Sequence, residues 1–118
     1  MNTPLEVAMI AARALADKKA ISISVLQISD LTVMADYFVI CTGSSTTHLK
    51  TLADAVQKAL EDAGEKLGHV EGRGGGTWVL MDFGCLVVHL FMAETRAFYD
   101  LERLWQDAPR IKIDGLEA

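Results

Sequence analysis

The sequence of 118 residues has little of what marks several large classes of protein. Its two cysteines, Cys41 and Cys85, each lie among apolar neighbours, which predicts two buried thiols and neither a disulfide framework nor a zinc site. The longest apolar stretch, residues 79–93, is interrupted by an aspartate, a glycine and a histidine, so it is too short for a membrane-spanning helix. No basic segment followed by an apolar one opens the chain, so we expect no secretory signal and a cytoplasmic protein.

Basic residues are also in the minority, because 11 lysines and arginines face 16 aspartates and glutamates and leave a net charge of −5. The phosphates of nucleic acids repel such a chain, so we expect no direct contact with DNA and leave a basic protein open as a partner. Hydrophobic residues reach 51%, enough for a folded core, and the length suits one domain. We therefore predict one domain over residues 1–108 and a mobile tail over residues 109–118.

Two segments have the capping signals and the apolar spacing of helices. Residues 3–6 (Thr-Pro-Leu-Glu) form a capping box with proline at the first helical position, and an apolar stripe follows as far as Ala16. The second segment begins after the serine pair at 44–45, carries apolar residues at helical spacing, and ends at Gly64.

Two further segments predict strands. Residues 21–28 place two serines on one side, which indicates a strand with one less buried face. Residues 37–41 are apolar throughout, which is typical of a strand covered on both faces. Because a helix follows the second strand directly, we predict a right-handed β-α-β crossover.

The last part of the chain predicts a hairpin and a helical segment. Residues 77–82 and 85–91 form the hairpin around Phe83-Gly84, and residues 93–106 are helical, either as one helix or as two with a break near Asp100. The fold class is therefore a single α/β domain with a mixed β-sheet and flanking helices.

The predicted hairpin has two faces of different character. One face combines large apolar side chains with a carboxylate and an imidazole. With a two-residue turn at Phe83-Gly84, its opposed pairs are Trp78 with His89, Leu80 with Val87, and Asp82 with Cys85. The other face is almost wholly aliphatic, which predicts the core side.

Two interpretations of the mixed face remain open. Burial of an aspartate and a histidine without partners is costly, whereas a half-polar face with a tryptophan is typical of a docking surface. Alternatively, the C-terminal helical segment covers this face with the large apolar side chains that it carries, which are Phe98, Leu101, Leu104 and Trp105. Helical spacing favours a core position for Trp105.

Patterns for catalysis are incomplete. The triplet at residues 82–84 matches a kinase motif by chance, and the glycine run at 72–76 lacks the ending of a P-loop. The turn at 43–45 looks like the phosphate-holding entry of nucleotidyltransferases, which also need two carboxylates one residue apart on a strand. The one such Asp-x-Asp/Glu pattern is Asp100 with Glu102, and it lies in a helical segment, where the two side chains diverge. We therefore expect no enzyme, metal or cofactor. The alternative is a nucleotide-binding or nucleotidyl-transferring enzyme with a degenerate metal site.

Three ordered segments resemble the signatures of the ribosomal silencing factor family, also called Iojap-like. They are Asp36-Tyr37-Phe38-Val39-Ile40 with Thr42-Gly43-Ser44-Ser45, Trp78–Gly84 with Val87-Val88-His89 and Phe91, and Tyr99–Trp105. The resemblance covers residues 5–107. Cys85 stands where the family often has aspartate, which removes one acidic group from the mixed face.

The resemblance implies a nucleotidyltransferase-like fold without transferase activity. It also implies a translational repressor that binds the large ribosomal subunit through its ribosomal protein number fourteen and blocks joining of the small subunit, which damps translation under nutrient limitation. Together with the hairpin faces, the resemblance predicts which residues contact the partner. The aromatic or apolar contacts are Trp78, Leu80, His89 and Phe91. Asp82 and Glu94 pair with basic groups of the partner, and Tyr99 borders the contact surface. A homodimer of the free protein through the Trp78 face is a further hypothesis.

Overall fold

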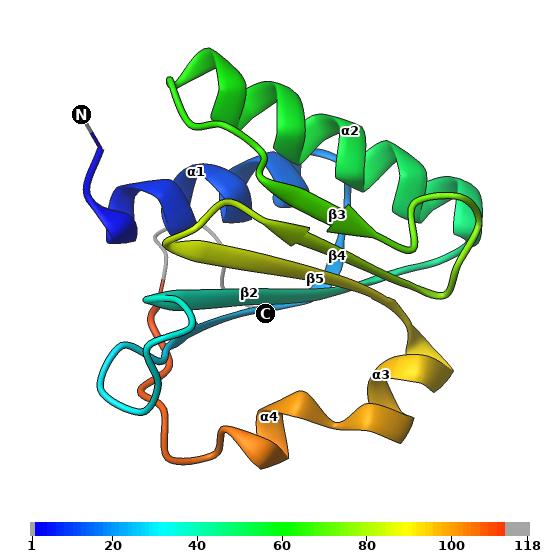
Figure 1. The fold of residues 1–118 in the computed structure, drawn as a ribbon. Helices are drawn as coiled ribbons and strands as arrows, with labels where there is room; N and C mark the ends of the chain where they lie inside the picture. The colour runs from blue at the N-terminus through cyan, green and yellow to red at the C-terminus, as the bar shows by residue number, and fades with distance from the viewer. Residues whose placement is uncertain (1, 113–118) are drawn as a thin grey trace.

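A mixed five-stranded sheet in the order β1-β2-β5-β4-β3 runs through the computed structural model, which describes residues 2–112 (Figure 1). Its strands are β1 (Ile21–Gln27), β2 (Tyr37–Gly43), β3 (His69–Glu71), β4 (Trp78–Asp82) and β5 (Leu86–Met92). The helices are α1 (Pro4–Asp17), α2 (Thr46–Asp62), α3 (Ala93–Tyr99) and α4 (Leu101–Leu104). β2 and β5 are parallel, and the other neighbours are antiparallel. The predicted α/β domain with a mixed sheet and flanking helices is confirmed.

Helices α1 and α2 cover one face of the sheet, and their sequence signals are confirmed (Figure 1). The Thr3 hydroxyl accepts a hydrogen bond from the Glu6 N–H, and the Glu6 carboxylate accepts one from the Thr3 N–H. Ser45 caps α2, and Gly64, with φ +90°, follows its end. Among residues 2–112, no helix has both the length and the apolar composition that crossing a membrane requires.

Strand β2 is buried along its whole length, as its apolar sequence predicts. The chain passes from β2 through α2 to the parallel strand β5, and the β3–β4 pair is inserted between α2 and β5. The sequence does not predict the edge strand β3, because three residues carry too little pattern.

The hairpin of β4 and β5 differs from the predicted register by two residues. Trp78 pairs with Phe91, and Asp82 pairs with Val87. The Phe83 N–H donates to the Leu86 carbonyl oxygen over 2.8 Å, so the pairing continues to these two residues and the two-residue turn is Gly84-Cys85, one residue later than predicted. Since side chains alternate with a period of two, this shift keeps the residues of β4 and β5 on their predicted faces, and the aliphatic face packs in the core under α1 and α2. Cys85 is the exception, because it lies in the turn, is only partly buried and packs against the aliphatic core instead of facing Asp82.

The last helical segment takes the broken form. Asp100 has a left-handed φ of 47°, where α3 ends and α4 begins. Both short helices lie on the sheet face opposite α1 and α2 (Figure 1). Trp105 is partly buried and packs edge-on against Phe38, with ring centroids 5.5 Å apart, so it lies at the margin of a core rather than inside it as predicted. Phe98, by contrast, is 81% exposed.

The start of the predicted tail is attached to β1. The Gln27 N–H donates to the Pro109 carbonyl oxygen over 2.9 Å, and the Ile111 N–H donates to the Val25 carbonyl oxygen over 2.8 Å. Backbone bonding thus joins residues 109–111 to the edge of the sheet rather than leaving them free. Residues 113–118 of the predicted tail lie outside the described residues.

Candidate partner-binding surface

The sheet face opposite α1 and α2 is covered only in part (Figure 1). Residues from α4 onwards pack over β1, β2 and β5 and enclose a second, smaller core. Its buried residues are Leu26, Ile28, Ala35, Phe38, Ile40, Val87, Phe91 and Ala108. On β4, Trp78, Leu80 and Asp82 are only partly buried, and we refer to the exposed surface of Trp78 and Leu80 as the β4 face. The mixed face is therefore buried over β1, β2 and β5 and partly accessible over β4. Coverage by the C-terminal segment, the second interpretation of the sequence, holds for the buried part, and the accessible part remains open to a partner.

Trp78 is held in place by two other aromatic rings and one hydrogen bond. Its ring stacks on Phe91 with centroids 4.9 Å apart and lies 4.6 Å from the Tyr99 ring of α3. Its Nε1 donates a hydrogen bond to His89 Nδ1 over 3.1 Å. A side chain fixed in this way loses little conformational entropy when a partner covers its remaining surface. Trp78 is thus a large aromatic side chain held in one position before any partner binds, and side chains of this type dominate the binding energy of many protein interfaces.

His89 supports this tryptophan from the interior in its neutral form. An indole N–H can only donate, so Nδ1 of His89 is the acceptor and the ring proton is on Nε2. The residue is 3% exposed, and its Nε2 has no hydrogen-bond partner within the described part of the chain. Burial lowers the pKa of His89 from 6.5 to about 4. The imidazole is therefore uncharged at neutral pH.

Acidic side chains border the β4 face. Asp82 lies at the end of β4, and Glu94 lies in the first turn of α3. The edge strand adds Glu71, since Glu71 pairs with Leu80 in the sheet. His69 pairs with Asp82, and its Nε2 lies 3.0 Å from Glu71 Oε2. An apolar centre with carboxylates around it is complementary to a basic partner surface.

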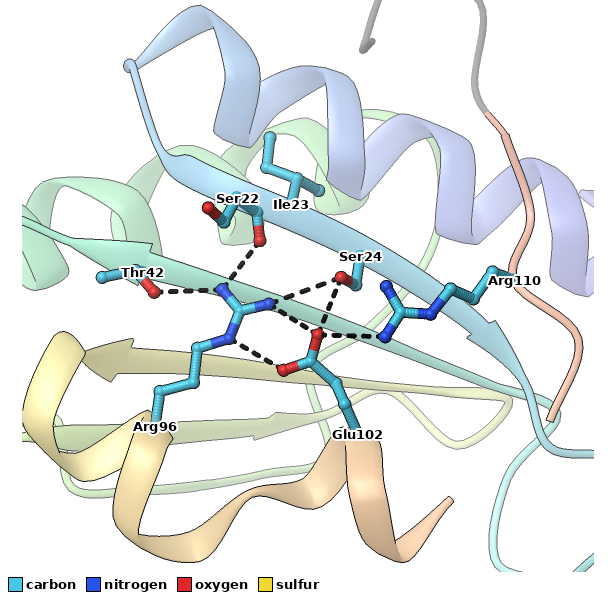
Figure 2. A pocket seen from close by; sticks show the side chains of 7 residues that line it. All are labelled: Ser22, Ile23, Ser24, Thr42, Arg96, Glu102 and Arg110. Atoms are coloured by element: carbon cyan, nitrogen blue, oxygen red, sulfur yellow. Dashed lines mark hydrogen bonds and ion pairs between the residues drawn. The ribbon is translucent and has the colours of Figure 1, made fainter. Parts of the chain in front are cut away.

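A separate polar cluster fastens α3 and α4 to the sheet (Figure 2). Arg96 of α3 and Glu102 of α4 form a two-fold ion pair, with Nε–Oε1 and Nη2–Oε2 distances of 2.9 Å. Arg96 Nη1 also donates to the Ser22 carbonyl oxygen over 2.7 Å and to the Thr42 hydroxyl over 3.0 Å. The cluster lines an open pocket of about 450 Å³. It connects both C-terminal helices to β1 and β2.

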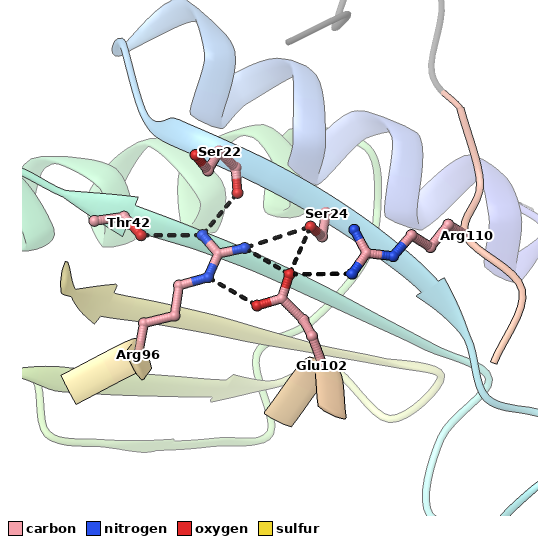
Figure 3. A network of polar contacts seen from close by, with 6 residues as sticks. All are labelled: Ser22, Ser24, Thr42, Arg96, Glu102 and Arg110. Carbon is pink, nitrogen blue, oxygen red and sulfur yellow. Dashed lines mark hydrogen bonds and ion pairs between the residues drawn. The ribbon is translucent and has the colours of Figure 1, made fainter. Parts of the chain in front are cut away.

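This network uses all N–H donors of the Arg96 guanidinium (Figure 3). Its remaining donor reaches Ser24 Oγ at 3.4 Å, and Ser24 donates to Glu102 Oε2 over 3.0 Å. Hydrogen bonds from Arg96 lower the pKa of Glu102, so the carboxylate stays ionised. Since Arg96 has no donor left for a ligand, the cluster is a structural clamp, and we refer to it as the Arg96 clamp.

The structure corrects two of the predicted contact residues. Phe91 is completely buried, and His89 is almost so, because β5 lies inside the sheet and Trp78 packs against both rings. They support Trp78 from beneath and do not reach the surface. The other predicted contact residues are at least partly accessible, and they are Trp78, Leu80, Asp82, Glu94 and Tyr99.

The described residues show no arrangement typical of a metal site. Among residues 2–112, no group of three or more histidine, cysteine, aspartate or glutamate side chains is arranged so that it could hold a metal ion. Glu102 is held by Arg96, and Asp100 occupies the break between two helices, so the two carboxylates do not form a pair. Burial raises the pKa of Cys41 to about 12, which keeps this thiol protonated and unreactive.

Comparison with known proteins identifies the family. The profile of a family described as "Ribosomal silencing factor during starvation" matches residues 1–118. The chain belongs to this family. The resemblance drawn from the three sequence segments is thereby confirmed.

Individual relatives of this silencing factor family agree in sequence and fold. Ribosomal silencing factor RsfS of Halalkalibacterium halodurans is 36% identical over 111 residues, which cover 94% of this chain and 95% of that protein. Mouse "Mitochondrial assembly of ribosomal large subunit protein 1" is 36% identical over 94 residues, which cover 77% of this chain and 41% of the mouse protein. A crystal structure of a Chromobacterium violaceum protein superposes with a TM-score of 0.87 at 34% identity, covering 96% of this chain and 93% of that one. The bacterial relative's name describes regulation rather than catalysis.

Two features of this family member escape prediction from its sequence. Arg96 and Glu102 are six residues apart, a spacing that brings the side chains together only because the helix breaks at Asp100. Glu71 lies beside the β4 face only because β3 pairs with β4, and the alternation from His69 to Glu71 is the one sequence signal of β3.

Proposed function

We propose that this protein binds the large ribosomal subunit through its ribosomal protein number fourteen, on the intersubunit face. Bound there, it prevents the small subunit from joining and damps translation when nutrients are scarce. The description of the family as silencing factors in starvation supports the proposal, as does the mouse relative named for assembly of the ribosomal large subunit. The proposal places the protein in the cytoplasm, together with the ribosomes.

The observation that carries the proposal is the preformed β4 face. Trp78 is fixed by Phe91, Tyr99 and His89, yet part of its surface remains open to a partner. Within a folded protein, a large apolar side chain held at the surface in one conformation is typical of an interface.

Charge favours a basic protein as the partner. The chain carries a net charge of −5, and the β4 face is bordered by Asp82, Glu94 and Glu71. Like-charge repulsion keeps such a surface away from bare RNA, whereas basic ribosomal proteins attract it. Electrostatic steering then directs the chain to protein on the subunit surface.

The proposed role requires binding and no chemistry. We propose that the fold is related to nucleotidyltransferases and lacks the carboxylate pair with which those enzymes hold Mg²⁺. The engagement of Glu102 by Arg96 supports this view, because that carboxylate is already neutralised within the protein. A homodimer of the free protein, if it forms through Trp78, competes with the ribosome for the same side chain.

Co-sedimentation with purified large subunits tests the proposal. We expect the protein to sediment with large subunits but not with small ones, and the double variant Trp78→Ser with Asp82→Lys to lose this binding. The loss follows from removal of the aromatic anchor and reversal of one charge at the rim.

The matched control is Asp62→Lys on α2, a carboxylate that is 67% exposed on the opposite side of the sheet. This variant makes the same charge change and should bind as the wild type does. Circular dichroism verifies that both variants are folded. Equal binding by the double variant and the control would contradict the proposed surface.

A further inference from the structure

Helices α3 and α4 carry an exposed apolar ridge beside the β4 face. Phe98 is 81% exposed, Leu104 is 73% exposed and Tyr99 is 50% exposed, although all three lie within seven residues of one another. Phe98 and Leu104 border one open groove of about 600 Å³. Apolar side chains gathered in this way are uncommon on a monomer without a binding role.

The ridge is continuous with the β4 face through Tyr99. The Tyr99 ring lies 4.6 Å from Trp78 on one side and contacts Phe98 edge-on at 5.1 Å on the other. Trp78, Tyr99 and Phe98 therefore form one row of touching rings that begins on β4 and ends on α3. A partner that covers Trp78 reaches Phe98 with the next part of its surface.

The ridge is also held rigidly, although its helices are short. α3 has seven residues and α4 has four, and neither has a buried residue, so neither is stable by itself. The Arg96 clamp fixes both, since Arg96 lies two residues before Phe98 and Glu102 lies between Tyr99 and Leu104 in the chain. The Arg96 and Glu102 side chains are only 13% and 18% exposed. Their ion pair therefore holds the two helices in place, while the apolar side chains of the ridge on the same helices remain exposed. Such preorganisation lowers the entropic cost of binding.

We infer that the Phe98–Leu104 ridge is a second half of the docking surface, and that its groove receives an apolar side chain of the same basic large-subunit protein that covers Trp78. This inference rests on the proposed function and extends the contact from β4 to α3 and α4. A second copy of the chain is the less suitable occupant, because it brings another net charge of −5 against a surface bordered by Asp82 and Glu94.

The test compares two double variants in binding to purified large subunits. Phe98→Ser with Leu104→Ser removes the ridge. Val33→Ser with Met34→Ser, in the loop between β1 and β2, removes two apolar side chains that are 104% and 64% exposed and lie outside the row of rings. We expect the ridge variant to bind at least about tenfold more weakly and the loop variant to bind within about twofold of the wild type. Because all four side chains are exposed, both variants should keep the circular dichroism spectrum and melting temperature of the wild type.

Three other results would contradict the inference, and they separate a failure of the ridge from a failure of the proposed function. If the ridge variant binds like the wild type while Trp78→Ser with Asp82→Lys does not bind, the ridge is no part of the contact and the proposed function stands. If the ridge variant only converts a dimer of the free protein into a monomer in sedimentation equilibrium, the ridge holds a second copy and the inference is overturned. If the wild type itself does not bind large subunits, the proposed function fails, and this inference fails with it.

Discussion

The two faces of the sheet are built from different kinds of contact. The face under α1 and α2 is an aliphatic core in which Leu15, Leu52 and Met81 are fully buried. The face under α3 and α4 mixes apolar residues with a buried histidine and with the Arg96 clamp. On the second face, the side chains of Trp78, Leu80 and Asp82 on β4 remain partly open to solvent.

The difference separates residues that stabilise the fold from residues that shape a surface. An aliphatic core needs no polar group, because burial alone offsets the loss of conformational entropy. Replacement of a buried ion pair by apolar groups of similar size is often neutral or stabilising, and a buried polar group costs free energy unless it is hydrogen-bonded. Here they hold Trp78, Tyr99 and the ridge in defined positions, so their value lies in the geometry of the second face.

The largest expected effect is on the first face. Leu52→Ala leaves a cavity beneath α2, where the wild-type side chain is 0% exposed, and should lower the free energy of unfolding by about 3 to 4 kcal/mol. Phe98→Ser on the ridge of the second face should change it by less than about 0.5 kcal/mol. Chemical denaturation followed by circular dichroism measures both. A comparable loss from the two substitutions would remove the distinction between the faces.

A smaller effect is expected from breaking the Arg96 clamp. Arg96→Met leaves the Glu102 carboxylate partly buried without its main partner and should cost about 2 to 3 kcal/mol of the free energy of unfolding. Glu102 keeps its contact with Ser24 and lies 3.6 Å from Arg110, which limits the loss. Denaturant titration of the purified variant gives the value.

The control for the clamp is the double variant Arg96→Met with Glu102→Gln. It also removes the stranded charge, so it should recover part of the stability lost by Arg96→Met alone. No recovery would mean that the pairing of the two charges is not what the clamp contributes.

A still smaller effect is expected on the pH dependence of the free energy of unfolding, and it comes from His89, which is buried on the second face. His89 has its pKa lowered to about 4 in the folded protein, against 6.5 for a free imidazole. The unfolded chain therefore binds more protons than the folded one between these values, and stability falls as the pH falls through this window. Between pH 7 and pH 5 the contribution of His89 amounts to about 2 kcal/mol.

His89→Gln is the matched variant for this measurement, because its amide oxygen can still accept the hydrogen bond from Trp78 Nε1 but does not titrate. Its free energy of unfolding should depend less on pH across the same window than that of the wild type. Parallel curves for the two proteins would show that His89 is not the titrating group.

Local signals in the sequence were sufficient for most of the fold. The capping box at Thr3 and Glu6 and the apolar run of β2 each act within a few neighbouring residues, so they predict α1 and β2 directly. The faces of the hairpin were also predictable although its register was not, since a shift of two residues preserves side-chain alternation.

The parts of the surface that depend on distant contacts could not be predicted in this way. Whether His89 and Phe91 are accessible depends on which strand lies beside β5 and on the position of Trp78, and neither is a local property. The clamp joins Arg96 to Ser22 and Thr42, which are 74 and 54 residues away in the chain. No periodicity within one helix reports such pairs.

An assay of subunit joining is the most direct test of the proposal that the protein, bound to the large ribosomal subunit, prevents the small subunit from joining. Purified large subunits are incubated with an excess of the protein, small subunits are then added, and the mixture is separated on a sucrose gradient. Our interpretation predicts that the peak of joined ribosomes decreases and that the protein sediments with the free large subunits. Normal joining of the two subunits in the presence of this excess would contradict it.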